Sequence, residues 1–180
     1  GQTGELCGAG GTYAFPPLTV NLRHHHAWLP DGQLLLVDDQ GQVVLLAPCV
    51  PGVQDVAPQS TELVTEILAQ DPGKGRVLAK STDEFWIFDA HTLNWQPIPG
   101  ITPNPYDAHW DHAAWQPGGV QLMIARLNGR DASDGSTLYL IAGDTGQVLR
   151  SLPMAEANDQ SAPRVDWLSP QELLLSSSGV

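Results

Sequence analysis

The side chains best suited to chemistry in this sequence stand just ahead of three tryptophans, Trp28, Trp115 and Trp167. Most of them are histidines or carboxylates, the groups that bind divalent transition-metal ions in proteins. The candidate binding residues are His24, His25, His109, Asp111, His112 and Arg164. Their recurrence before tryptophans predicts that one structural position is repeated along the chain.

A metal ion is one candidate ligand, with His25, His109 and His112 as its ligands. His109 and His112 are three residues apart, and side chains at that spacing on a strand face opposite sides. A loop would therefore have to bring the pair together. In the alternative interpretation, these histidines fill loop and channel positions and bond to backbone groups. No motif calls for a cofactor, and none is expected.

A second polar cluster lies in the segment 128–136. Asp131, Ser133 and Asp134 surround Gly135, and alternating oxygen side chains in a turn can hold calcium. The glutamate that completes an EF-hand loop is missing, so a polar hairpin tip is the favoured interpretation. The nucleophile-elbow motif Gly-x-Ser-x-Gly and the phosphate-loop motif Gly-x-x-x-x-Gly-Lys-Ser are also missing. The sequence therefore predicts no catalytic residues.

Short apolar runs separated by polar turns supply the elements that would position these side chains. Residues 34–37 and 43–46 flank the turn DDQGQ, and residues 77–80 and 85–88 flank the turn STDE. This pattern is typical of β-hairpins. The 18 glycines and 15 prolines of the chain favour turns over long helices.

The same arrangement recurs along the chain. The segments HHHAWLPDGQLLLV, DHAAWQPGGVQLMI and PRVDWLSPQELLL align on their tryptophans, and each has a proline two or three residues later. The first two tryptophans are 87 residues apart, or two units of about 43, and the next two are 52 apart. A period of roughly 40–50 residues with four short strands is typical of a β-propeller.

The segment AWLPDGQLLLVDDQGQVVLL resembles the Trp-x-Pro-Asp-Gly repeat of TolB-type β-propellers, which are related to WD-type repeats. The resemblance implies an all-β fold, a β-propeller or part of one, made of four-stranded antiparallel blades. It also implies that the tryptophan packs between blades and that Pro30, Asp31 and Gly32 turn the innermost strand into the next. The six candidate residues would then lie at one mouth of the central channel, where propellers commonly bind ligands.

We expect a single propeller-like domain over residues 1–180. Its expected blades span about residues 23–60, 62–100, 108–155 and 163–180, the last one truncated or completed by residues 11–22. The composite blade would close a four-bladed ring, near the lower limit for propellers. In the alternative, the chain is part of a longer propeller, and the remaining blades are its partner.

Charge and composition exclude several classes of partner. The 20 acidic and 8 basic residues give a net charge of −12, which repels phosphate backbones and anionic lipid surfaces. No segment approaches the roughly 20 apolar residues that span a bilayer. We therefore expect neither nucleic-acid binding nor membrane insertion. Cys7 and Cys49 lie among Gly and Pro; a disulfide between them would indicate export to the periplasm or the extracellular space, and two unpaired thiols are the alternative.

Three functions fit these observations. The favoured one is a non-catalytic binding or scaffold propeller that recognises a protein, a peptide or a small ligand at one face of the ring. The first alternative is the gating portion of a larger enzyme resembling serine peptidases of the prolyl-oligopeptidase type. The second is a metal-dependent propeller enzyme that uses a histidine-lined channel. Fold alone does not decide among them.

Overall fold

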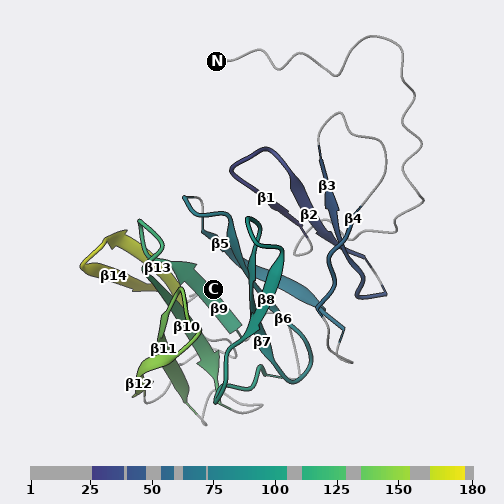
Figure 1. The fold of residues 1–180 in the computed structure, drawn as a ribbon. Coiled ribbons are helices and arrows are strands. Elements are labelled where there is room, and N and C mark those ends of the chain that lie inside the picture. The colour runs from purple at the N-terminus through teal and green to yellow at the C-terminus, as the bar shows by residue number, and fades with distance from the viewer. Residues whose placement is uncertain are drawn as a thin grey trace.

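The computed structural model describes residues 26–38, 40–47, 54–58, 63–71, 73–104, 111–128, 135–154 and 163–176. All regular secondary structure in these ranges is β-strand, which confirms the all-β prediction (Figure 1). Among these residues there is no helix long and apolar enough to cross a membrane.

The strands form three four-stranded antiparallel sheets and one two-stranded sheet, in chain order. Blade 1 contains β1 (His26–Trp28), β2 (Leu34–Val37), β3 (Val43–Leu46) and β4 (Gln54–Asp55). Blade 2 contains β5 (Glu66–Asp71), β6 (Arg76–Lys80), β7 (Phe85–Asp89) and β8 (Asn94–Pro97). Blade 3 contains β9 (Asp111–Trp115), β10 (Gln121–Leu127), β11 (Ser136–Ala142) and β12 (Val148–Met154). The two-stranded sheet contains β13 (Arg164–Ser169) and β14 (Glu172–Ser176).

Each strand pairs with the next strand in the chain, so each blade is a simple meander whose first strand, β1, β5 or β9, lies at one edge. Figure 1 shows the sheets following one another from blade 1, in purple, to β13 and β14, in yellow. Four-stranded antiparallel blades in sequence are the architecture that the repeats predicted.

The predicted Pro-Asp-Gly turn joins β1 to β2. Gly32 has a φ of 82°, a conformation that glycine adopts without steric cost. The N–H of Gly32 donates to the carbonyl of Leu29 at 2.9 Å, and the N–H of Gln33 donates to the Asp31 carboxylate at 3.0 Å. Proline, aspartate and glycine thus fix this turn together.

The hydrophobic core is divided among the contacts between successive sheets. Side chains alternate between the two faces of a strand, so each inner sheet contributes to two clusters. Val77 and Ala79 of β6 pack against blade 1, whereas Leu78 between them packs against blade 3. A third cluster, which includes Leu127 and Val165, joins blade 3 to β13. A large aliphatic side chain buried in this way contributes about 1.5–3 kcal/mol.

The three repeat tryptophans lie in different surroundings. Trp115 is buried between blades 2 and 3, and the indole N–H of Trp167 donates to the Ala114 carbonyl of blade 3 at 3.1 Å. Both side chains point at the preceding sheet, as the repeat implies. Trp28 is 59% exposed, and no described sheet precedes blade 1. The expectation of packing between blades therefore fails for Trp28 among the described residues.

The outermost strands of blades 2 and 3 are poor templates for further pairing. Pro97 lies in β8 and Pro153 in β12, and proline cannot donate a ladder hydrogen bond. In contrast, β14 has no proline, and its Leu174 and Leu175 are exposed. Residues 11–22, predicted to complete this sheet, lie outside the described residues, and so do Cys7, Cys49 and the candidate calcium ligands Asp131, Ser133 and Asp134.

Candidate functional site

Three of the six candidate mouth residues lie in the described part of the chain. Asp111 begins β9, His112 follows it, and Arg164 begins β13, the inner strand of the next sheet. Adjacent residues on a strand face opposite sides, so Asp111 and His112 point toward different neighbouring sheets. Arg164 is exposed. The other three, His24, His25 and His109, lie outside the described residues, and the predicted mouth site remains a prediction.

Asp111 takes part in a buried ionic cluster between blades 2 and 3. Lys80, the last residue of β6, lies 3.1 Å from Asp111 Oδ2 and 3.4 Å from Glu66 Oε2. The backbone N–H of Asn104 also donates to Asp111 Oδ2, at 3.1 Å. Asp111 Oδ1 is buried without a hydrogen-bond partner. Burial raises the pKa of Asp111, and the attraction of Lys80 partly offsets that rise.

The cluster of Glu66, Lys80 and Asp111 holds the two blades together. One buried ammonium lies between two carboxylates from different inner strands, so loss of the lysine would remove an attraction that both carboxylates share. No group of three or more His, Cys, Asp or Glu side chains among the described residues could hold a metal ion. Since His25 and His109 are not described, the metal hypothesis is untested.

A second buried cation lies at the other end of β6. Arg76 pairs with Asp71 at 2.8 Å, and the two side chains are 6% and 1% exposed. Its guanidinium also donates to the backbone carbonyls of Gly119 and Gly143 in blade 3. The same group lies 4.6 Å from the centre of the Trp115 ring, a cation–π geometry. Arg76 and Lys80 therefore tie blade 2 to blade 3 at both ends of one strand.

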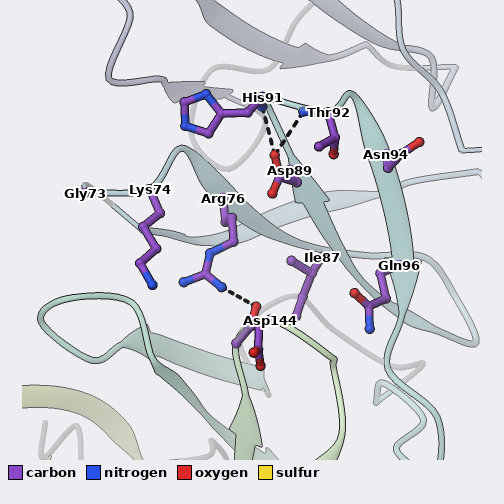
Figure 2. Close-up of a pocket in the computed structure, with 11 residues that line it drawn as sticks. Gly73, Lys74, Arg76, Ile87, Asp89, His91, Thr92, Asn94, Gln96 and Asp144 are labelled. Atoms are coloured by element: carbon purple, nitrogen blue, oxygen red, sulfur yellow. Dashed lines mark hydrogen bonds between the residues drawn. The ribbon is translucent and has the colours of Figure 1, made fainter.

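Beside Arg76, a cleft of about 570 Å³ opens between blade 2 and the β11–β12 turn of blade 3; we call it the blade 2–3 cleft (Figure 2). This volume is within the range of small-ligand sites. Its lining residues are Gly73, Lys74, Arg76, Ile87, Asp89, His91, Thr92, Asn94, Gln96, Gly143 and Asp144. The cleft lies at the turn end of the blades, where β5 ends and β6 begins, opposite the end at which Asp111 and Arg164 begin their strands.

Strand register explains why the cleft is polar. Arg76, Asp89 and Asn94 are paired across β6, β7 and β8 and form one row on the sheet face toward blade 3. The next row contains Leu78, Ile87 and Gln96. Apolar packing between the blades thus gives way to charged and amide side chains toward the turns. Blade 3 approaches closely at Gly119 and Gly143 and buries Arg76, whereas Asp89 is half-buried and Asn94 is exposed at the other end of the row.

Hydrogen bonds within the β7–β8 turn fix the conformation of one border of the cleft. The Asp89 carboxylate accepts the N–H of His91 at 2.9 Å and the N–H of Thr92 at 3.1 Å, as Figure 2 shows. Leu93 follows with a φ of 56°, a left-handed conformation that few non-glycine residues adopt. Both bonds are accepted by Asp89 Oδ1, so Oδ2 of this half-buried carboxylate has no hydrogen-bond partner among the described residues.

Two exposed charged side chains at the cleft have no ion-pair partner among the described residues. Lys74, on the β5–β6 turn of blade 2, and Asp144, on the β11–β12 turn of blade 3, are both exposed. They come from different blades and lie at different sides of Arg76 (Figure 2). Among the described residues, the exposed part of the cleft thus offers one cation and one anion, and the half-buried Asp89 adds a second carboxylate.

Sequence reasoning did not find this cleft. Its residues come from three separate turns and from a cross-strand row, and no short motif joins them. One signal was present in RVLAK, residues 76–80. Charged residues four apart in an apolar strand share a face, and one that packs between sheets must find buried partners.

No protein-family model matches the chain, and no curated protein matches it either. Solved structures do match. The structure described as "YCF48 bound to D1 peptide" has a TM-score of 0.50 at 13% identity, over 81% of this chain and 44% of that one. Hsv2 of Kluyveromyces lactis has a TM-score of 0.50 at 12% identity, over 83% and 51%.

The GH74 xyloglucanase from Xanthomonas campestris has a TM-score of 0.52 at 15% identity, over 82% of this chain and 24% of the enzyme. These proteins are β-propellers, and the chain described here has the fold of propeller blades. The chain spans about half or less of the length of each of the three. Identities this low establish the fold alone.

Proposed function

We propose that the chain is a propeller recognition module that binds an extended segment of a partner protein in the blade 2–3 cleft. The observation that carries this proposal is the cleft itself, a 570 Å³ opening lined by amide, hydroxyl and charged side chains. Such groups can bond to the main chain and the polar side chains of a peptide. We also infer that the repeats are of the TolB type, on the Trp-x-Pro-Asp-Gly match at Trp28–Gly32.

The outer edges of blades 2 and 3 favour a cleft over strand addition. A peptide that extends a sheet needs a free row of N–H and C=O groups along an edge strand. Pro97 and Pro153 interrupt that row in β8 and β12. A ligand near blade 2 must therefore be held mainly by side chains. The polar side chains that line the cleft are close enough together to do this. The propeller described as bound to a peptide shows that a fold of this kind accommodates one.

The experiment is a binding screen with a cleft-filling variant. The probe is a positional-scanning library of fluorescein-labelled octapeptides, capped at both ends and measured by fluorescence anisotropy. The proposal predicts that selected peptides bind the wild type and lose at least about tenfold in affinity in Gln96→Trp, because the indole fills the cleft.

Gln54→Trp is the matched control. Gln54 lies in β4, the outermost strand of blade 1, is exposed, and is not among the residues that line the cleft. It should leave the affinity unchanged. Failure of every library peptide to bind the wild type would overturn the proposed function. Equal affinity of the wild type and Gln96→Trp for the selected peptides would mean that the peptides bind outside the cleft and would contradict the proposal.

A further inference from the structure

The charged side chains of the blade 2–3 cleft differ in how far they are already engaged within the protein. Arg76 is paired with Asp71, and Asp89 accepts two backbone N–H groups of its own turn. Lys74 and Asp144 have no ion-pair partner among the described residues. A ligand in the cleft would therefore meet one exposed positive group and one exposed negative group, on turns of different blades, and beside them the half-buried carboxylate of Asp89.

Besides these two charges, the cleft offers a carboxamide. Gln96 is half-buried on β8, in the row of Ile87, and its side chain has no hydrogen-bond partner in the described ranges. Gly146 makes room for it, because a Cβ on Gly146 would lie 3.3 Å from Gln96 Nε2. A carboxamide has both a donor and an acceptor and can pair with the N–H and C=O groups of a peptide main chain.

Other ligand chemistries fit the cleft less well. A phosphate or a polyanion would meet Asp144 and the net charge of −12. A sugar ring would find no tryptophan, tyrosine or phenylalanine among the lining residues on which to stack. A peptide with opposite charges on its side chains matches both free groups at once, and such complementarity gives specificity more than raw affinity.

We propose that the cleft selects extended peptide segments of mixed charge, with an acidic side chain at Lys74, a basic side chain at Asp144 and a main-chain amide paired with Gln96. This inference rests on the proposed function and adds the class of sequence that the module recognises. The order of the two charges along the peptide fixes the direction in which it lies.

The test uses the same octapeptide library with charge-reversed variants of the full chain. Lys74→Glu should replace the preference for an acidic residue by a preference for a basic one, and Asp144→Lys should do the opposite at the second position. Each reversal should weaken the best wild-type peptide by roughly tenfold. The double variant should select peptides with the two charges exchanged. Both side chains are exposed, so these variants should fold as the wild type does.

Arg150→Glu and Asp166→Lys are the matched controls, since both residues are exposed and lie on β12 and β13, outside the cleft. They should leave the selected sequences unchanged. If they alter the selection as much as the cleft variants do, the preference reflects net charge and the inference is overturned. Peptides that bind in the cleft, lose affinity in Gln96→Trp and yet ignore Lys74→Glu and Asp144→Lys would overturn the inference while leaving the proposed function intact.

A second measurement tests the pairing with Gln96. Each main-chain amide of the best peptide is methylated in turn. One methylation should weaken binding to the wild type about tenfold but have little effect on Gln96→Ala, where the partner is already missing. If each methylation weakens binding to the wild type and to Gln96→Ala by the same factor, the main chain of the peptide does not pair with Gln96.

Discussion

The guanidinium of Arg76 lies 4.6 Å from the centre of the Trp115 ring, so the second strand of blade 2 is held against the inner strand of blade 3. The same guanidinium is paired with the buried Asp71 carboxylate and donates to carbonyls of blade 3. Because these contacts also form the floor of the blade 2–3 cleft, the stability of the blade interface and the shape of the candidate site depend on the same residue.

Arg76→Ala should lower the free energy of unfolding by about 3–5 kcal/mol, since it leaves the buried Asp71 carboxylate without its ion-pair partner. Arg76→Lys should recover only part of that loss, because an ammonium cannot reproduce the planar fork of donors. Urea unfolding followed by tryptophan fluorescence measures both changes. Arg150→Ala, at an exposed position on β12, should stay within about 0.5 kcal/mol of the wild type. A loss for Arg76→Ala as small as that would contradict the ionic account.

Gly119→Ala should destabilise the chain much more than Gly118→Ala. Both glycines have positive φ, 65° and 90°, so both substitutions introduce backbone strain. Only at Gly119 would the new Cβ run into the Asp71 carboxylate and the Arg76 guanidinium, whereas nothing lies within 4 Å of a Cβ at Gly118. The difference between the two unfolding free energies isolates the steric clash. Equal losses would mean that Arg76 and Asp71 do not approach Gly119 as described.

Asp111→Asn should change how stability depends on pH. Burial raises the pKa of Asp111 above its usual 3.8. An acid whose pKa is raised by folding holds its proton more tightly in the folded state. Its contribution to stability is therefore complete below the unfolded pKa and is lost as pH rises through the folded pKa. The stability of the wild type relative to Asp111→Asn should accordingly fall as pH rises from below 3.8. A difference that grows with pH would show that attraction to Lys80 outweighs burial.

Trp115→Ala and Trp28→Ala should differ sharply although the two tryptophans are equivalent in the repeat. Trp115 is buried between blades, and its truncation should cost about 3–5 kcal/mol. Trp28 is 59% exposed, so its truncation should cost no more than about 1 kcal/mol. Thermal or urea unfolding of the two variants compares them directly. A similar large loss at Trp28 would mean that a further segment covers this face of blade 1.

The repeat pattern was sufficient to predict the blades, because strand alternation and the turn chemistry of Pro30–Gly32 are local properties of the sequence. The hairpin strands predicted at 34–37 and 43–46 are those observed. The exposure of Trp28 could not be predicted in this way. It depends on which sheet lies before blade 1, and no local pattern specifies that.

The candidate site was harder to predict than the fold. The sequence drew attention to Asp111, His112 and Arg164. Asp111 and Arg164 begin the inner strands β9 and β13, and His112 is the second residue of β9. The structure shows that Asp111 bonds to Lys80 within the blade interface. The cleft instead depends on the register that places Arg76, Asp89 and Asn94 in one row and on the approach of a turn from the next blade. Pairing register and contacts between blades are non-local, so a single sequence does not reveal them.

The most direct test of the account is a nuclear magnetic resonance titration of the ¹⁵N-labelled chain with the best peptide from the library. The cleft assignment predicts the largest shifts at the amides of His91–Gln96 and at Gly143 and Asp144, and small shifts at Asp111, His112 and Arg164. The opposite distribution, with the largest shifts at the starts of β9 and β13, would place the ligand at the channel mouth and contradict the central claim.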